Sequence, residues 1–295
     1  MKLGIIGGSG LYEMSGLKNM KPLQVSTPFG PPSDAYVRGE LGETEVFFLP
    51  RHGRGHHIMP SELNHKANIY GFKSLGVERV IGVSAVGSLR EDVRPRDIVL
   101  PDQYFDRTKG SMHHTFFGHG IVAHVAFAEP VCPDLRAALS AVITGTIASN
   151  RAYHGLQVRD RGTYVNMEGP AFSTKAESNV YRQLGFDVIG MTSLPEAKLC
   201  REAEICYASI AMVTDYDCWH ESAASVSVEM ILDNLRANTQ LAHDVLRAAA
   251  AHLPTQRTCS CTHALENAIV TAPEAIPAQV KQSLAPIVGK YLNGK

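Results

Sequence analysis

Two carboxylates, Asp215 and Asp217, follow directly on the largely apolar run 205–214. A run of this kind predicts a buried strand. Carboxylates at its end are costly unless they have partners, because unpaired buried charge is strongly disfavoured. In open α/β sheets, ligands bind beyond the carboxyl ends of the strands. The pair could therefore grip or protonate a ligand rich in donors and basic nitrogens, or it could cap a helix or complete a turn.

Cationic groups and hydroxyls accompany four other predicted strands. They are Ser9 after strand 2–6, Arg51 and His52 after 45–49, Ser84 at the end of 79–84, and Thr192 after 187–191. Arginine offers a bidentate fork to phosphate, and a histidine adds a further donor. A solvated polar loop is the competing explanation for the basic segment taken alone. If the strand ends meet at one edge of a sheet, these groups together form a phosphate cradle.

The glycine-rich start, GIIGGSG at residues 4–10, invites comparison with a dinucleotide fingerprint. The G-x-G-x-x-G spacing is not reproduced, and no clean helical pattern follows. Small residues could still let backbone N–H groups and one hydroxyl approach a phosphate closely. A tight turn that needs positive φ is the alternative. No nicotinamide cofactor is expected.

Short apolar strands and amphipathic helices alternate along the chain and must position these groups. Strands are predicted at residues 2–6, 45–49, 79–84, 97–100, 162–167, 187–191 and 205–214, and helices from 61, from 133, from 174 to 185 and over 226–253. The alternation predicts a single α/β domain with a mixed central β-sheet flanked by helices. Residues 1–253 are expected to form this domain. Residues 254–295 are expected to form an extension that packs on it or on a neighbouring subunit.

The composition limits the kinds of partner. The chain has 295 residues, 44% of them apolar, and nearly balances 28 basic with 29 acidic residues. No broad basic field is available for nucleic acid or a membrane surface, so a small-molecule ligand is favoured. No apolar run approaches the roughly 18 residues needed to span a bilayer. We expect a cytoplasmic protein.

Cysteines and histidines give no metal motif in the sequence. Six cysteines are too few for a disulfide scaffold, and Cys259-Ser260-Cys261 is either a strained redox pair or two ordinary thiols in a loop. The 13 histidines include two adjacent pairs, at 56–57 and 113–114. Neither pair shows the spacing of a zinc module or a His-Glu-x-x-His helix. No metal is expected.

Seven segments in order along the chain resemble the trimeric purine nucleoside phosphorylase superfamily, in its branch that acts on 5′-methylthioadenosine. They are GIIGGSG at 4–10, TPFG at 27–30, RHGR at 51–54, GSLRE at 87–91, EGPAFS at 168–173, MTSLPE at 191–196 and AMVTDYDCW at 211–219. The resemblance implies phosphorolysis of 5′-methylthioadenosine to adenine and 5-methylthioribose 1-phosphate. It implies a homotrimer, with a hexamer as the alternative, and phosphate as a co-substrate with no cofactor.

The resemblance also implies roles for individual residues. The residues expected to bind phosphate are Ser9, Arg51, His52, Ser84, the backbone near Ala85, and Thr192. Those expected to bind the nucleoside are Met191, Phe172, Asp215, Tyr216, Asp217 and His56. Substrate specificity is expected to depend on Ser173 and Val228. His124 is expected to approach the 5′ pocket from a neighbouring subunit. Ser9 and Ser84 stand where relatives often have threonine.

The reaction suits these residue types. Breaking an N-glycosidic bond builds positive charge on the ribosyl ring and negative charge on the departing purine. Bound phosphate would stabilise the positive charge, and an acid that protonates N7 would stabilise the negative charge. Asp215 is the expected catalytic acid, with a raised pKa, and Asp217 the expected acceptor for the 6-amino group. The alternatives are a phosphorylase for 6-oxopurines, a nucleosidase that uses water, and a non-catalytic binding module. Two aspartates favour 6-aminopurines, because a 6-oxo group needs a donor facing it.

Overall fold

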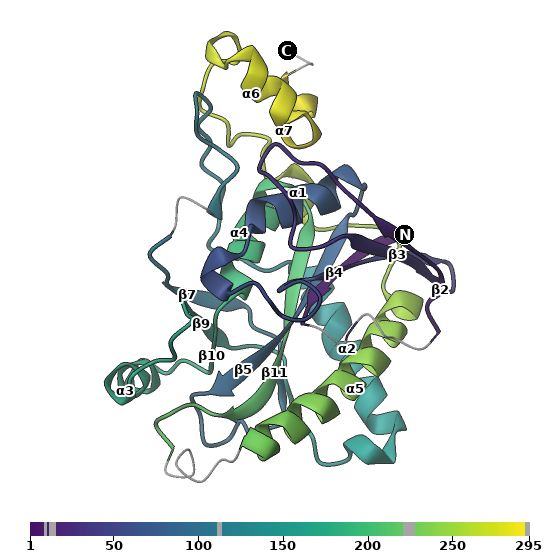
Figure 1. The fold of residues 1–295 in the computed structure, drawn as a ribbon, viewed down its shortest axis with the longest axis vertical. Coiled ribbons are helices and arrows are strands. Elements are labelled where there is room, and N and C mark those ends of the chain that lie inside the picture. Colours follow the sequence, from purple (N-terminus) through teal and green to yellow (C-terminus); the bar gives the residue numbers. More distant parts are fainter. Residues whose placement is uncertain (9–10, 12–15, 111–113, 221–227, 293–295) are drawn as a thin grey trace.

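Strand β5 (Arg79–Ser88) is the centre of the sheet in the computed structural model, which describes residues 1–8, 11, 16–110, 114–220 and 228–292 (Figure 1). It pairs in parallel with β1 (Lys2–Gly7) and β11 (Cys206–Tyr216), and antiparallel with β10 (Val188–Gly190). The two parallel partners end at the same edge of the sheet as β5. This edge is where the predicted site residues lie.

The remaining strands extend the sheet on either side of this centre. On one side β4 (Thr44–Pro50) pairs in parallel with β1, and β3 (Tyr36–Leu41) and β2 (Lys18–Leu23) follow antiparallel. On the other side come β9 (Thr163–Met167) and β7 (Gln103–Arg107), while β6 (Ile98–Val99) and β8 (Val158–Arg159) continue from β11. The prediction of a mixed central sheet flanked by helices is confirmed.

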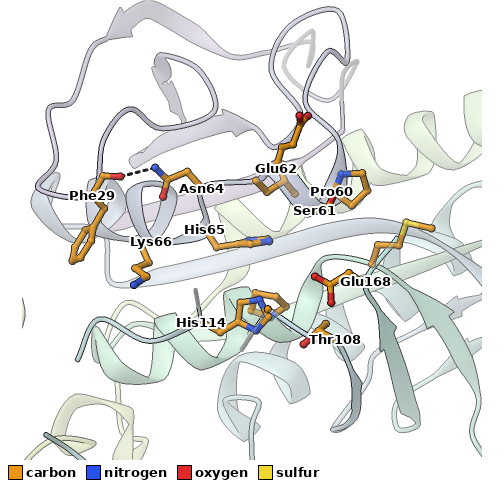
Figure 2. A pocket seen from close by; sticks show the side chains of 14 residues that line it. Phe29, Pro60, Ser61, Glu62, Asn64, His65, Lys66, Thr108, His114 and Glu168 are labelled. Carbon is orange, nitrogen blue, oxygen red and sulfur yellow. Dashed lines mark hydrogen bonds between the residues drawn. The ribbon is translucent and has the colours of Figure 1, made fainter. Parts of the chain in front are cut away.

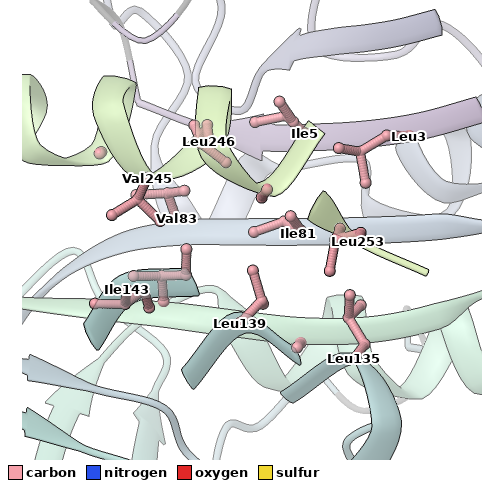
Figure 3. Packing of buried hydrophobic residues seen from close by; sticks show 14 of the residues in the cluster. Leu3, Ile5, Ile81, Val83, Leu135, Leu139, Ile143, Val245, Leu246 and Leu253 are labelled. Carbon is pink, nitrogen blue, oxygen red and sulfur yellow. The ribbon is translucent and has the colours of Figure 1, made fainter. Parts of the chain in front are cut away.

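Helices cover both faces of the sheet. One face packs under α2 (Pro133–Ser149) and α5 (Val228–His252), with apolar side chains of both helices against those of β1 and β5 (Figure 3). The opposite face packs under α1 (His65–Ser74) and α4 (Ser193–Glu202). Helix α3 (Lys175–Gln183) lies at the periphery. In the described part of the chain, no helix combines the length and apolar character needed to cross a membrane.

The chain after α5 returns to the α1 and α4 face. Helices α6 (Ala278–Ser283) and α7 (Ala285–Leu292) contribute Leu284, Ile287 and Val288 to the apolar cluster there. Short 3-10 helices also occur, at Pro60–Glu62, Arg151–Tyr153, Ser260–His263 and Pro273–Ala275. Residues 254–292 therefore pack on their own chain.

Local sequence explains where three of the helices begin. Helix α2 begins at the predicted proline, and α3 carries the predicted capping box between Thr174 and Glu177. The helix predicted from residue 61 instead begins at His65. The side chain of Asn64 accepts a hydrogen bond from the backbone N–H of Ala67 and so caps α1.

Candidate active site

A register shift in β11 sets the position of Asp215. Val213 pairs with Val86, and the next pair is Asp215 with Gly87, so the strand bulges between them and continues to Tyr216. Residues that are paired on adjacent strands point to the same face of the sheet. Without the shift, Asp215 would pair one residue later and project to the other face. The strand therefore ends later than the predicted residue 214. The bulge determines which face of the sheet the carboxylate of Asp215 projects from.

The face that Asp215 shares is open at this edge. Ile81 and Val83 of β5 pack under α2 and α5, but Ala85, next on the same face, is exposed although it lies on the central strand. Asp215 itself is partly buried, and it accepts a hydrogen bond of 2.5 Å from the hydroxyl of Thr214. Burial, with a smaller contribution from the charge of Asp217, raises the pKa of Asp215. The arrangement suits a proton donor beside an open surface.

Asp217 is more fully buried and held from two sides. Its backbone N–H donates to the carbonyl of Ser88 at 2.9 Å, and the hydroxyl of Ser178 in α3 donates to Oδ2. One carboxylate oxygen is thus committed to Ser178, and Oδ1 has no hydrogen-bond donor among the described residues. Tyr216 is directed elsewhere: its ring stacks on His220, and its hydroxyl donates to the carbonyl of Glu91. Successive residues of an extended chain point to opposite sides, so the side chain of Tyr216 points away from those of Asp215 and Asp217.

Strand β10 brings Thr192 back to Ser84. Its antiparallel register pairs Val188 with Ser88 and Ile189 with Gly87, so the chain beyond β10 runs beside the earlier residues of β5. Continued in the same register, Thr192 reaches the level of Ser84. The Oγ of Ser84 is buried without a hydrogen-bond partner among the described residues. Thr192 precedes α4 and makes no side-chain capping bond in the described structure, so both hydroxyls are available to a ligand.

Arg51 follows β4 and is buried against Glu196 of α4. Nε lies 2.5 Å from Oε1 of Glu196, and the two side chains are 3% and 0% exposed. The guanidinium also donates to the carbonyls of Val83, at 2.9 Å, and Ile6, at 3.2 Å. Burial alone would lower the pKa of Arg51, but the contacts with Glu196 outweigh it and the pKa is raised. Arg51 is thus a cation held in a fixed position by contacts with β1 and β5, just after the end of β4.

His52 is a neutral histidine with a defined orientation. Its Nδ1 lies 2.8 Å from the carbonyl of Ile58, which can only accept, so Nδ1 carries the proton and Nε2 is free to accept. Burial and the charge of Arg51 lower its pKa to about 4. The ring of His56 stacks on it with centroids 4.5 Å apart.

A pocket of about 440 Å³ is lined by Met191, which precedes Thr192 in the chain, and by residues around the start of α1. Glu168 lies at one end of the pocket and Phe29 at the other, and the rings of His65 and His114 meet edge to face in its lining, with centroids 6.0 Å apart (Figure 2). His65 begins α1 and is buried; burial and the neighbouring His114 lower its pKa to about 3. This volume is in the range of small-molecule sites.

The loop 168–173 begins at Glu168, which lines this pocket, and ends at Ser173, which contacts Cys218 just after β11. A Cβ on Gly169 would come within 2.6 Å of the Sδ of Met191, so this glycine, with φ of +74°, lets the loop approach. Phe172 is 82% exposed. Ser173 accepts a hydrogen bond from the thiol of Cys218 through its carbonyl, at 3.3 Å, which fixes the loop beside Asp217.

Three further predicted residues remain to be accounted for. Ser9 and the side chain of Val228 lie outside the described residues. His124 lies where Ala123 bridges to Ile269 of the C-terminal extension.

Sequence reasoning missed two residues of the site, Glu196 and His65. Glu196 lies four residues after Thr192, one helical turn into α4. An acidic residue one turn from a predicted phosphate ligand could have indicated a partner for the predicted arginine. His65 had no such signal, because only the packing of α1 buries it beside Arg51 and His52.

A family model described as the phosphorylase superfamily matches residues 2–251. The chain belongs to this superfamily. More particularly, it is 54% identical over 290 residues to the S-methyl-5′-thioadenosine phosphorylase of Geobacter sulfurreducens, covering 98% of this chain and 99% of that protein. Its identity to the S-methyl-5′-thioadenosine phosphorylase of Koribacter versatilis is also 54%, covering 98% of this chain and 96% of the relative.

Solved structures agree with these relatives. A methylthioadenosine phosphorylase from an Antarctic soil metagenomic library superposes with a TM-score of 0.91 at 46% identity, covering 97% of this chain and 98% of the other. The methylthioadenosine phosphorylase of Schistosoma mansoni in complex with tubercidin gives a TM-score of 0.81 at 36% identity, covering 90% of this chain and 96% of the other.

Proposed function

We propose that this chain catalyses the phosphorolysis of S-methyl-5′-thioadenosine to adenine and 5-methylthioribose 1-phosphate. The names of relatives matched over nearly the whole length of both chains support this activity. The structural observation that carries it is the placement of Asp215 by a strand bulge on the open face beside Ala85, with a raised pKa. An acid in this position meets the main requirement of the reaction, protonation of a departing base.

Asp215 donates its proton to N7 of the purine as the glycosidic bond breaks. An aspartate of ordinary pKa, near 4, would be almost fully ionised at neutral pH and a poor donor. Burial supplies the upward pKa shift, and the negative charge of Asp217 adds to it. The hydrogen bond from Thr214 opposes the shift and holds the carboxyl group in place.

Asp217 accepts a hydrogen bond from the 6-amino group. Because Ser178 already donates to Oδ2, the remaining oxygen Oδ1 presents an acceptor to the base. An amino group satisfies it, whereas a 6-oxo group would face it with a second acceptor. This selects adenine nucleosides over their 6-oxo counterparts.

Phosphate lies between the ends of β4, β5 and β10. The hydroxyls of Ser84 and Thr192, the backbone at Ala85 and the hydroxyl of Ser9 donate to its oxygens. Neutral His52 can accept a hydrogen bond at Nε2 from the P–OH group of monohydrogen phosphate. Arg51 supplies positive charge, although most of its N–H groups are already engaged within the protein.

The remaining residues form the nucleoside pocket. Met191 and His56 contact the ribose, Phe172 covers the base, Ser173 lies at its edge, and Val228 borders the 5′-methylthio group. The exposure of Phe172 supports a role against a ligand or a second chain. A homotrimer, in which His124 of one chain reaches the pocket of another, completes the site. Phosphate is the co-substrate, and the proposed reaction uses no cofactor.

Base release from methylthioadenosine, adenosine, methylthioinosine and inosine, each with and without phosphate, tests this function. We expect phosphate-dependent release that is fastest with methylthioadenosine. Equal release without phosphate would identify a nucleosidase instead. Faster cleavage of the inosine compounds would assign the site to 6-oxopurines.

A further inference from the structure

Four cysteines from three distant parts of the chain meet at the amino-terminal end of β11. Cys132 precedes α2, Cys206 is the first residue of β11, and Cys259 and Cys261 lie at the 3-10 helix Ser260–His263. Their four Sγ atoms all lie within 4.8 Å of one another, and those of Cys206 and Cys259 are 3.3 Å apart. Cys132, Cys206 and Cys261 are buried, and Cys259 is partly exposed.

We propose that these four cysteines bind a structural zinc ion. A tetrahedral site with Zn–S bonds of about 2.3 Å places its sulfur atoms about 3.8 Å apart, so the present grouping needs shifts of only about 1 Å. Soft thiolate ligands in a set of four select zinc among the abundant divalent metals. Binding replaces four S–H bonds by four Zn–S bonds and releases four protons, so it needs no oxidant.

The surroundings favour negative charge on the sulfur atoms. Cys132 occupies the N-cap of the 17-residue helix α2, and its Sγ accepts a hydrogen bond of 3.5 Å from the backbone N–H of Leu135. The positive end of a helix stabilises a thiolate. A zinc ion with four thiolates carries two net negative charges, so further donors and cations nearby are useful.

Two arginines hold the segment where the extension joins the sheet. Arg79 is paired with Cys206 in the sheet, and its guanidinium donates to the carbonyl of Gln256 at 2.8 Å. Arg257, two residues before Cys259, donates to the carbonyl of Glu204 at 3.1 Å. Both cations therefore hold the segment that delivers Cys259 and Cys261.

The site is structural because four protein sulfurs fill a tetrahedral shell and leave no position for water or substrate. It is also remote from the candidate active site: Cys206 and Asp215 stand near opposite ends of β11, about 30 Å apart along an extended strand. Zinc at this position would join the C-terminal extension to α2 and β11. Its loss should lower stability far more than the rate of base release.

Metal analysis of the full chain, purified without added metal or chelator, tests the proposal. Inductively coupled plasma mass spectrometry should find close to one zinc per chain in the parent protein, and none in the double variant C259S/C261S. The matched control is Cys200→Ala, a buried cysteine outside the cluster, which should retain the zinc. A pyridine-2,6-dicarboxylate chelator should lower the Tm of the parent and of Cys200→Ala, but leave the Tm of the double variant unchanged.

Intact-mass measurement after alkylation under denaturing, non-reducing conditions separates zinc from disulfides. With zinc, all six cysteines become alkylated once the metal is removed. Blocked cysteines in the metal-free chain would show that the cluster is oxidised, and would overturn the proposal. Absence of zinc from the parent, iron in its place, or retention of zinc by the double variant would also overturn it.

Discussion

The guanidinium of Arg51 and the carboxylate of Glu196 form an ion pair inside the protein, with Nε 2.5 Å from Oε1. Tyr207 adds a hydrogen bond of 2.8 Å to the other carboxylate oxygen. The pair links the segment after β4 to α4, and so joins two segments of the proposed phosphate cradle. Glu196 is therefore a positioning residue for Arg51 and Thr192.

Replacing Glu196 by Gln should destabilise the protein by about 3–5 kcal/mol, because Arg51 would remain buried without its counter-charge. Urea denaturation measures the change. The matched control is Asp233→Asn, which breaks an ion pair with Arg236 whose side chains are 64% and 77% exposed. Its effect should stay within about 0.5 kcal/mol. Equal effects of the two substitutions would contradict the structural role of the buried pair.

Asp215→Asn should reduce turnover of methylthioadenosine by about 10²-fold or more, because the amide cannot donate the proton that N7 needs. Steady-state assays with saturating phosphate measure the loss. Phosphate affinity should change little, since Asp215 lies outside the proposed cradle. Near-full activity in the variant would remove Asp215 from the role of acid.

The raised pKa of Asp215 also predicts a dependence of stability on pH. The folded state binds this proton more tightly than the unfolded state, so the contribution to stability is fully present below about pH 4 and is lost as the pH rises through the raised pKa. Asp215→Asn should therefore gain stability relative to the parent as the pH rises above about 4. Parallel stability curves for the two proteins would show that the pKa is not raised by folding.

Asp217→Asn should move specificity towards 6-oxopurines. Ser178 donates to one carboxylate oxygen of Asp217, and it would keep donating to the amide oxygen of the variant. The amide NH₂ would then face the base and suit an oxo group. The ratio of kcat/KM for methylthioadenosine over methylthioinosine should fall by about 10²-fold or more. An unchanged ratio would separate Asp217 from recognition of the 6-position.

His65 should make the protein less stable in acid. Its pKa is lowered to about 3 in the folded state by burial and by His114, so the unfolded state binds the proton first as the pH falls. The free energy of unfolding should drop between about pH 6.5 and 3, with up to about 1.4 kcal/mol per pH unit from this residue. Urea denaturation of His65→Gln should show a shallower slope. The same slope as in the parent would mean that His65 titrates normally.

Local sequence determined the elements and the kinds of chemistry available. The capping box at Thr174 and Glu177, the proline that begins α2 and the apolar run of β11 all depend on neighbours in the chain. Such preferences are readable because capping and side-chain periodicity act over a few residues. The acidic pair after β11 and the cationic segment after β4 could be named as candidates for the same reason.

Only the tertiary structure decided how these groups are aimed and paired. The bulge that turns Asp215 to the open face and the antiparallel return of β10 towards Ser84 both depend on pairing with β5, far away in sequence. Glu196 became a partner of Arg51, and four cysteines became one cluster, through contacts across the chain. Burial, register and charge pairing are properties of the packed molecule, so the sequence could supply the residues but not their arrangement.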